Sequence, residues 1–299
     1  MAPPLVSVLM TAYNRESLVG AAIESVLAQW WTDFELIVVD DGSSDRTQEI
    51  AREYARRDPR VRVYANERNL GDYGNRNHAA SLARGEFLKF HDSDDLMYVH
   101  CLSVMVPALQ AEPTAGFGLT NSAAWPGGPV PMLLAPKQAY QREFLGHGLF
   151  MCGPAGALFR ADVFRQLGGF QDFGAPSDTI FWLRACARYP VLLLPADLFY
   201  YREHEGQSLR ARHAAAQYAT VPAHMWRALA APECPLDEQE RTIARRNLAY
   251  TTARSVWRAA RQGDFGLAWR RTEASELTVG EWVRYLRPPR RSVIAGTSP

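Results

Sequence analysis

Apolar runs and amphipathic stretches alternate along the first hundred residues. Four short apolar runs predict buried strands, at residues 6–10, 35–39, 61–64 and 85–90. Apolar residues at helical spacing, with Ser44 or Asp45 as the N-cap of the second helix, predict helices at 18–27, 47–57 and 75–83. Strands that alternate with helices favour an α/β fold with a mostly parallel sheet and helices on both faces.

The pattern becomes more helical further along the chain. A short helix is predicted at residues 161–167, ended by Gly168 and Gly169, and another begins near Asp178. Residues 241–261 predict a long helix, residues 278–286 a short one, and residues 292–299 a loose tail. The last third is therefore expected to be mostly helical.

The acidic run from Asp92 to Asp95 directly follows the fourth predicted strand. Three carboxylates within four residues repel one another unless a cation or basic groups hold them. Hard oxygen ligands suit Mg²⁺ or Mn²⁺, which commonly bridge carboxylates to the phosphates of a substrate. An acidic turn that caps the next helix is the other interpretation, and the run alone does not decide between the two.

Polar residues gather at the carboxyl ends of the predicted strands. Tyr13 and Asn14 follow the first strand, Asp40 and Asp41 the second, and the acidic run the fourth. A doubly wound sheet collects such ends along one edge, where its ligands bind. The chain contains neither a G-x-G-x-x-G nor a G-x-x-x-x-G-K-[ST] motif, which removes the main support for dinucleotide binding or P-loop chemistry.

Composition limits the class of protein. The 299 residues include 33 basic and 32 acidic side chains, so the overall charge gives no reason to expect a nucleic-acid partner. Residues 241–291, however, hold 12 arginines and 4 acids. This excess is compatible with an anionic partner such as a membrane leaflet or with a solvated helical face. The favoured interpretation is structural: a helical subdomain that covers the core or forms a homo-oligomer.

The spacing of the cysteines and the lack of a leader or a long apolar run indicate the cellular compartment of the protein. The four cysteines are widely spaced with no C-x-x-C pair, which argues against a zinc site or a disulfide framework and fits a reducing compartment. No basic, apolar leader precedes residue 5, and no stretch approaches 18 uninterrupted apolar residues. We expect a cytoplasmic protein, or one that is peripheral on the inner face of the membrane.

Several motifs in order resemble those of glycosyltransferase family 2, a group of inverting enzymes with the GT-A fold. They occupy residues 6–14, 38–45, 69–71, 76–77, 85–86 and 92–95. The resemblance implies a GT-A fold with a Rossmann-like sheet. Its nucleotide-sugar half would be residues 1–115 and its acceptor and catalytic half residues 116–210. Residues 211–299 would form a helical, Arg-rich region.

The resemblance also implies a donor site. Tyr13 would pack on the base, Asp41 would accept from the base or ribose, and Gly71 would allow close approach of the backbone. The other implied nucleotide-sugar contacts are Thr11, Arg76, Asp92, Asp94 and Arg202. Asp94 is the expected direct ligand of a divalent metal, Mn²⁺ or Mg²⁺, with Asp92 and Asp95 acting directly or through ribose and water.

Two later segments would complete the site. Asp178 resembles the family's general base, although many relatives carry a second acid where this chain has Ser177; by itself, Asp178 would be assigned as a helix N-cap. His204, in an R-x-H segment with Arg202, would be the second metal ligand or a diphosphate contact. A solvated basic loop is the alternative for both residues.

The implied activity is a metal-dependent single displacement that moves a sugar from a UDP- or dTDP-sugar to an acceptor hydroxyl. The acceptor would be a glycan, a lipid-linked unit or a small molecule, in the synthesis of cell-surface polysaccharide or glycoconjugate. Two alternatives stay open: a catalytically dead relative that acts as a binding module, and a sugar-nucleotide pyrophosphorylase. Residues 11–15 lack the Gly-rich basic loop usual in the latter.

Overall fold

The computed structural model describes residues 3–120, 129–146, 148–150, 152–204 and 214–286. The chain divides into two compact units, and each is described by itself. Unit 1 comprises Met1–Leu134, Cys152–Ser177 and Tyr189–His204, and unit 2 comprises Ala135–Met151, Asp178–Arg188 and Glu205–Pro299.

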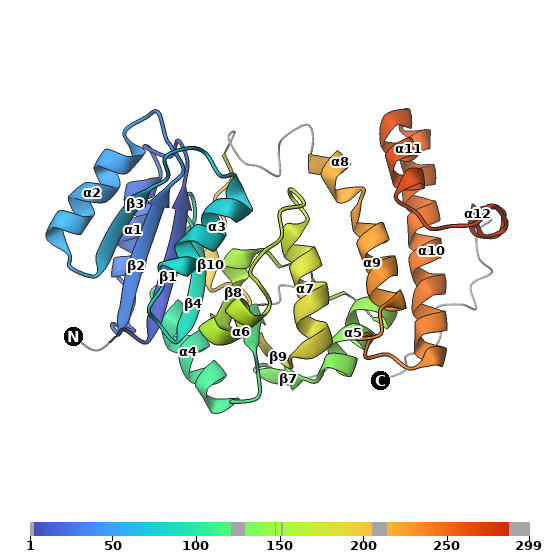
Figure 1. Ribbon diagram of the computed structural model, residues 1–299, viewed down its shortest axis with the longest axis horizontal. Coiled ribbons are helices and arrows are strands. Elements are labelled where there is room, and N and C mark those ends of the chain that lie inside the picture. The colour runs from blue at the N-terminus through green and yellow to red at the C-terminus, as the bar shows by residue number, and fades with distance from the viewer. Residues whose placement is uncertain (1–2, 121–128, 147, 151, 205–213, 287–299) are drawn as a thin grey trace. The chain divides into compact units, whose positions relative to one another are not determined.

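Unit 1 is built around an eight-stranded sheet, with a smaller sheet of two strands beside it, in the described part of the chain (Figure 1). The strand order is β3-β2-β1-β4-β8-β6-β9-β7. These strands are β1 Val6–Ala12, β2 Phe34–Asp40, β3 Val61–Ala65, β4 Phe87–Asp92, β6 Phe117–Thr120, β7 Met132–Leu134, β8 Ala157–Arg160 and β9 Val191–Leu194. The small sheet pairs β5 (Leu96–Met97) with β10 (Phe199–Tyr200). The helices of this unit are α1 Val19–Leu27, α2 Thr47–Arg57, α3 Asp72–Ser81, α4 Cys101–Ala111, the 3₁₀ turn Pro154–Gly156 and α6 Ala161–Gln166.

The predicted mostly parallel sheet is confirmed. Strands β3, β2, β1 and β4 are parallel neighbours, and β6 is parallel to β9. Strand β8 is antiparallel to β4 and β6, and β7 is antiparallel to β9. The four parallel strands are those predicted from the apolar runs, because strands that are covered on both faces are almost continuously apolar.

Some boundaries differ from those predicted. Strand β4 begins at Phe87 and not at Gly85, because the Gly85 backbone crosses close to β1. A Cβ on Gly85 would lie 2.6 Å from the Ser7 nitrogen, and the Gly85 N–H donates to Ser7 Oγ at 2.9 Å. Helix α3 begins at Asp72, three positions before the predicted start, because Gly71 provides its N-cap. Helix α2 begins at Thr47 as predicted.

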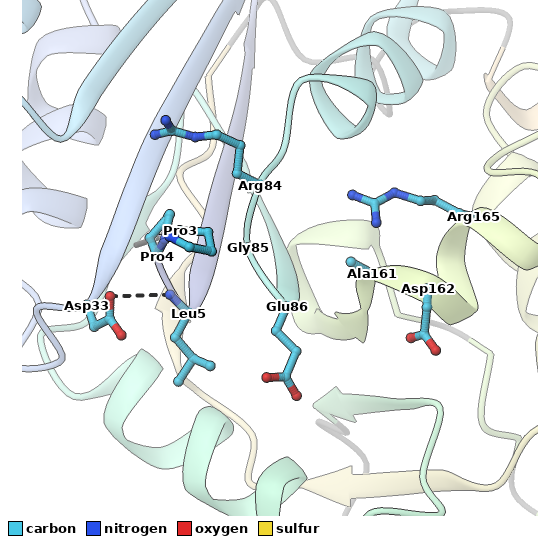
Figure 2. Close-up of a pocket in the computed structure, with 10 residues that line it drawn as sticks. All are labelled: Pro3, Pro4, Leu5, Asp33, Arg84, Gly85, Glu86, Ala161, Asp162 and Arg165. Atoms are coloured by element: carbon cyan, nitrogen blue, oxygen red, sulfur yellow. Dashed lines mark hydrogen bonds between the residues drawn. The ribbon is translucent and has the colours of Figure 1, made fainter. Parts of the chain in front are cut away.

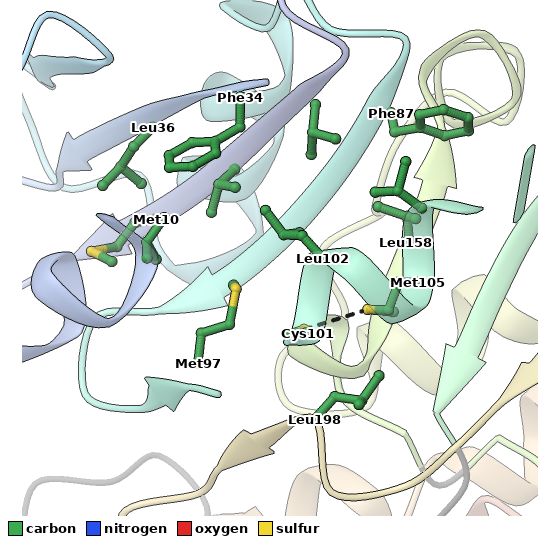
Figure 3. Packing of buried hydrophobic residues seen from close by; sticks show 14 of the residues in the cluster. Met10, Phe34, Leu36, Phe87, Met97, Cys101, Leu102, Met105, Leu158 and Leu198 are labelled. Atoms are coloured by element: carbon green, nitrogen blue, oxygen red, sulfur yellow. Dashed lines mark hydrogen bonds between the residues drawn. The ribbon is translucent and has the colours of Figure 1, made fainter. Parts of the chain in front are cut away.

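Each face of the sheet has its own apolar layer. Val6, Val8 and Met10 alternate along β1 and pack with α1 and α4 on one face, where Leu102 and Met105 approach them (Figure 3). On the opposite face, Phe90 contacts the rings of Phe159, Phe164 and Phe170 at centroid distances of 5.4–5.9 Å. The alternation of a strand's side chains between faces supplies both layers from the same strands.

Unit 2 is helical. Its helices are α5 Pro136–Leu145, α7 Ser177–Arg188 from Asp178 onward, α8 Ala214–Tyr218, α9 Val221–Ala230, α10 Glu238–Arg261, α11 Phe265–Glu273 and α12 Val279–Leu286. Tyr140 of α5 donates to the Leu183 carbonyl at 2.7 Å, and Lys137 pairs with Asp237 at 2.9 Å. Asp237 caps α10 reciprocally with Glu240. Within the described residues, no helix has the length and apolar character needed to cross a membrane.

Candidate active site at the carboxyl edge of the sheet

The carboxyl ends of β1, β2 and β4 are level with one another. Ala12 of β1 is in register with Asp40 of β2, and Thr11 with Asp92 of β4. The polar residues that follow these strands therefore emerge at one edge of the sheet, as the alternation of strands and helices predicts.

Side chains connect the first two loops at this edge. Ser43 Oγ accepts the Asn14 N–H at 2.8 Å, and Asn14 Oδ1 accepts the Ser44 N–H at 2.9 Å. Asp40 in turn accepts the N–H and the hydroxyl of Ser43. Asn14 adopts a positive φ of 52°, which an Asn tolerates better than most residues. The two loops are therefore fixed to each other by their own polar groups.

Asp41 holds the loop that leads into α3. Its carboxylate is buried and accepts from Asn66 Nδ2 at 2.7 Å, the Leu70 N–H at 2.8 Å and the Gly71 N–H at 3.0 Å. Gly71 has φ 78° and ψ 169°, a backbone conformation that residues other than glycine rarely adopt. In this structure Asp41 binds its own chain. The expected contact of Asp41 with a base or ribose stays a prediction.

Arg76 lies inside the site and is not a surface helix charge. It is 6% exposed; its Nε donates to Asp72 Oδ1 at 2.9 Å and its Nη2 to Asp92 Oδ1 at 2.7 Å. Its Nη1 is buried and has no hydrogen-bond partner in the described part of the chain. Partial burial acts to raise the pKa of Asp92, but the adjacent Arg76 outweighs this effect and holds that pKa below its ordinary range.

Asp94 is shared by two basic side chains from distant parts of unit 1. Its Oδ2 accepts from Arg15 Nε at 3.1 Å and lies 2.8 Å from His204 Nε2. Arg15 is fixed by further bonds from its Nη1 to the carbonyls of Tyr13 and Asn14. One carboxylate oxygen thus connects the loop after β1 with the segment after β10.

The two-stranded sheet brings the R-x-H segment to the acidic run. Leu96 pairs with Tyr200 and Met97 with Phe199, so the residues on either side of this ribbon are neighbours. The backbone N–H of Arg202 donates to Asp95 Oδ1 at 3.0 Å. This short pairing explains how residues more than 100 positions apart meet at one site.

The buried titratable groups in and just before the acidic run have pKa values shifted toward their neutral forms. Burial, and then the negative charge of Asp92, raise the pKa of Asp95 to about 7. Burial also lowers the pKa of His91 to about 3 and lowers that of Lys89. Lys89 is 1% exposed and donates to the carbonyls of Phe90 and Ala155, which links β4 to the 3₁₀ turn before β8.

The donor set fits a divalent cation. One oxygen from each of Asp92, Asp94 and Asp95 can be chosen so that all three lie within 4.8 Å of one another. For metal–oxygen distances of about 2.1 Å, ligands on opposite sides of an ion stand about 4.2 Å apart, so small carboxylate rotations suffice. Asp95 Oδ2 is buried and has no hydrogen-bond partner among the described residues, so its lone pairs are available to a cation.

Asp178 and Trp182 belong to α7 and lie in unit 2. The Asp178 carboxylate accepts the N–H and the hydroxyl of Thr179, at 2.5 and 3.2 Å. Asp178 is the second residue of α7 and these bonds go to the residue that follows it, so it does not stand at the N-cap position. A role as general base stays a prediction. Trp182 is fully buried and packs edge to face on Phe181. It is therefore part of the core and not a sugar platform.

The structure brings together most of the residues that the sequence singled out. Asp92, Asp94 and Asp95 form one cluster, and Arg76, Arg202 and His204 contact it. Thr11 lies beside Asp92 in the sheet, Tyr13 is 48% exposed on the next loop, and Gly71 contacts Asp41. Arg15, which contacts Asp94, was not predicted as a site residue. Its position directly after Asn14, in the loop that follows the first strand, could have indicated it.

A pocket of about 400 Å³ lies at the opposite edge of the same sheet (Figure 2). It is lined by the residues that precede β1, β2 and β4, among them Leu5, Asp33 and Gly85. Arg84 and Arg165 stand around it together with acidic side chains, so it shows no preference for an anion. Its position separates it from the carboxylate cluster at the carboxyl edge.

Comparison with known families and proteins gives consistent results. The family model Glycosyl transferase family 2 matches residues 7–168. The Escherichia coli UDP-Glc:alpha-D-GlcNAc-diphosphoundecaprenol beta-1,3-glucosyltransferase WfgD is 40% identical over 102 residues, which are 34% of this chain and 40% of WfgD. The chain spans only 26% to 40% of the length of several curated relatives that it matches.

Two solved structures share the fold. Staphylococcus aureus TarS 1–349 in complex with UDP-GlcNAc has a TM-score of 0.61 and 19% identity, covering 96% of this chain and 80% of TarS 1–349. Glucosyl-3-phosphoglycerate synthase from Mycobacterium tuberculosis, in complex with Mn²⁺, UDP and glucosyl-3-phosphoglycerate, has a TM-score of 0.56 and 19% identity, covering 77% and 81%. The expected GT-A fold is confirmed.

Proposed function

Because the chain belongs to glycosyltransferase family 2, we propose that it transfers a sugar from a UDP- or dTDP-sugar to an acceptor hydroxyl, with inversion and with a divalent metal. The observation that carries the proposal is the carboxylate cluster of Asp92, Asp94 and Asp95 at the carboxyl edge of the sheet. Arg76 and Arg15 add two guanidinium groups to this cluster. Few structural roles require three carboxylates and two arginines at one sheet edge.

The cluster suits the binding of a sugar diphosphate. Asp92, Asp94 and Asp95 would hold Mn²⁺ or Mg²⁺, with His204 as the additional ligand or as a diphosphate contact. When bound, the cation would supply Lewis-acid assistance to the diphosphate as the sugar–phosphate bond breaks. The TarS and glucosyl-3-phosphoglycerate synthase structures, which contain UDP-GlcNAc or UDP with Mn²⁺, support a donor of this class.

The protein's own residues would bind and orient the donor. Tyr13 presents an exposed ring for stacking on the base, and Thr11 and Asp41 would accept from ribose or base. Gly71 would let the backbone approach the nucleotide. Arg76 is held between Asp72 and Asp92, and its buried Nη1 has no acceptor among the residues that the structure describes; a phosphate or ribose oxygen would satisfy it. Arg202 would add a further phosphate contact.

Asp178 is proposed as the general base. It would take the proton from the acceptor hydroxyl while that oxygen attacks the anomeric carbon from the face opposite the diphosphate. One displacement then inverts the anomeric centre and needs no nucleophile from the protein. Correct alignment of the two substrates would supply a large part of the rate gain.

The proposed pathway is the assembly of a cell-surface polysaccharide or glycoconjugate. WfgD, by its name, adds glucose to a sugar on diphosphoundecaprenol, and this chain is similar to it over about a third of its length. A lipid-linked or glycan acceptor therefore agrees with the family relationship.

A thermal-shift panel tests the donor site. UDP, dTDP and GDP, and their sugar derivatives, are each added with Mn²⁺ or with EDTA. A ligand that binds only the folded protein increases the free energy of unfolding by about 2.7 kcal/mol at a hundredfold excess over Kd, and this stabilisation raises Tm. We expect stabilisation by UDP or dTDP that requires Mn²⁺ and is lost in Asp94→Asn.

Asp162→Asn is the matched control, because Asp162 is an exposed carboxylate of unit 1 that lines the pocket at the opposite edge. It should keep the full nucleotide shift. If no nucleotide changes Tm in the wild-type protein, with Mn²⁺ or with EDTA, the donor-site assignment is wrong. Nucleotide binding without any sugar transfer or donor hydrolysis would identify a binding module.

A further inference from the structure

One face of α10 alternates basic and apolar side chains along its whole length. Ile243, Arg246, Tyr250, Arg254, Trp257 and Arg261 follow one another at intervals of three or four residues, which places them on one side of the helix. All are exposed except Tyr250, which is half-buried. We call these six residues the α10 face; it extends over about 27 Å at 1.5 Å per residue.

Contacts within the helix order this face. Arg254 Nη1 donates to Tyr250 Oη at 2.6 Å, and the Arg261 guanidinium lies 4.6 Å from the centre of the Trp257 ring. These cation–π and hydrogen-bonded pairs hold the arginines beside the rings. The opposite side of α10, with Ala244, Leu248 and Ala259, is buried in unit 2. The α10 face is therefore the solvent side of a packed helix.

The charge of the segment is of one sign. Residues 241–261 contain six arginines and neither aspartate nor glutamate. No carboxylate of α10 beyond Glu240 is available to neutralise the α10 face. An exposed surface of this kind attracts an anionic partner.

Large apolar side chains extend the surface beyond the end of α10. Helix α11 follows a short turn and packs against α10, where Arg271 Nη1 donates to the Ser255 carbonyl at 2.9 Å (Figure 1). Phe265 and Trp269, one turn apart on α11, are 72% and 65% exposed, while Ala268 faces inward. Exposed aromatic rings beside arginines are typical of residues that sit at a membrane–water interface.

We propose that the α10 face, together with Phe265 and Trp269, docks this protein on an anionic lipid bilayer. The arginines would pair with lipid phosphates, and Ile243, Trp257, Phe265 and Trp269 would enter the region between the headgroups and the acyl chains. Binding of this kind adds the contributions of buried apolar area and of each basic side chain near the surface.

The chemistry favours a lipid surface over the other anionic or apolar partners. A nucleic acid would use the arginines but has little use for exposed Ile243 and Phe265. A second copy joined by a two-fold axis would place the arginines of one α10 face against those of the other, which is unfavourable. A bilayer with acidic headgroups satisfies both the charge and the apolar side chains.

Vesicle co-sedimentation of the full chain tests the proposal. We expect binding to equimolar phosphatidylglycerol and phosphatidylcholine vesicles, little binding to pure phosphatidylcholine, and weaker binding as salt is raised. Arg246→Glu with Arg254→Glu should lower the partition constant by at least about a hundredfold, because each unit of positive charge at the surface contributes about fivefold and the two reversals change the charge by four units. Phe265→Ser with Trp269→Ser should weaken binding while keeping its salt dependence.

Arg52→Glu with Arg56→Glu, on the exposed side of α2 in unit 1, makes the same change in net charge and should bind vesicles nearly as the wild type does. Circular dichroism checks that each variant is folded. Equal binding to neutral and acidic vesicles, or equal losses in the α2 and α10 variants, would overturn the proposal. The proposal would also be overturned if neither the wild type nor the α10 variant binds vesicles, while the wild type self-associates or binds an oligonucleotide and the α10 variant does not. The vesicles carry no sugar acceptor, so the result is independent of the proposed transfer reaction.

Discussion

Replacement of Arg76 by methionine should destabilise unit 1 through charge and not through volume. Arg76 is 7% exposed as a side chain and donates to Asp92 at 2.7 Å and to Asp72 at 2.9 Å. Methionine fills much of the same space but leaves the Asp92 carboxylate beside Asp94 and Asp95 with no adjacent cation from α3. In the wild-type protein the Arg76 guanidinium offsets the negative charge of Asp92, while Arg15 pairs with Asp94.

The structure sets the expected magnitude. Removing one partner of a buried ion pair costs about 3–5 kcal/mol. The Asp92 side chain is 27% exposed, so the lower end of this range applies, and the half-exposed Asp72 adds less than about 1 kcal/mol. We therefore expect a loss of about 3 kcal/mol in the free energy of unfolding of unit 1 at neutral pH.

Hydrogen exchange followed by mass spectrometry measures this loss in unit 1 alone. Peptides from β1 and β4 should exchange about a hundredfold faster in Arg76→Met, since about 1.4 kcal/mol corresponds to a factor of ten. The pKa of Asp92 is depressed in the folded wild type, so its stabilising contribution is present above the unfolded pKa and is lost as pH falls through the folded pKa. The difference between the two proteins should therefore narrow in acid.

Two comparisons separate charge from packing. Arg57→Met removes an exposed i,i+4 ion pair with Glu53 and should change the exchange by less than about threefold. In an Asp92→Asn background, Arg76→Met should cost much less than in the wild type, because the buried charge is already gone. If the cost is the same in both backgrounds, the electrostatic reasoning is wrong and lost packing explains the effect.

Three further predictions concern a glycine, the proposed base and a buried acid. Gly71→Ala should lower the stability of unit 1 by about 2 kcal/mol because of the positive φ at this position, whereas Gly153→Ala, at φ −69° with no neighbouring atom within 4 Å, should have little effect in the same hydrogen-exchange assay. Asp178→Asn should reduce kcat about 10²- to 10⁴-fold with the nucleotide thermal shift unchanged; a variant that retains full turnover would exclude Asp178 as the base. Glu35→Gln should cost about 2 kcal/mol at neutral pH, because burial opposes the charge but Arg84 and Arg62 outweigh it and lower the pKa of Glu35. The difference in unfolding free energy between the two proteins is present above the unfolded pKa of Glu35 and should disappear as pH falls through its folded pKa. If urea unfolding shows a constant difference down to pH 3, the stabilisation of the charged Glu35 by Arg84 and Arg62 is contradicted.

The parallel half of unit 1 could be predicted from the sequence because its strands are covered on both faces. Their apolar runs are long enough to be recognised, and the residues that end them are polar. The four-residue strands β6, β8 and β9 were not predicted. Such short segments leave no clear periodicity, and their pairing in antiparallel and parallel order depends on contacts far apart in the chain.

The same distinction applies to the site. The acidic run could be recognised because its three carboxylates are adjacent in the sequence. The contact of Arg15 with Asp94 joins residues 79 positions apart, and no local pattern indicates it. Lys89 was counted only as part of an apolar strand, although its ammonium group binds carbonyls of β4 and of the turn before β8. Local patterns therefore predict where polar groups emerge but not which of them bind each other.

The pairing of His204 with Asp94 has a consequence for the order in which the protein is made. The two residues lie 110 positions apart, and the β5–β10 ribbon that joins them contains the last strand of unit 1. On the ribosome, the strands from β1 to β4 are synthesised first and can pair early, because domains fold as the N-terminal parts emerge. The segment after β10 is added only when nearly all of unit 1 has left the tunnel. A nascent chain therefore exposes three carboxylates and two arginines before it has the histidine, so the proposed cation site is complete only when the last segment of unit 1 has been made.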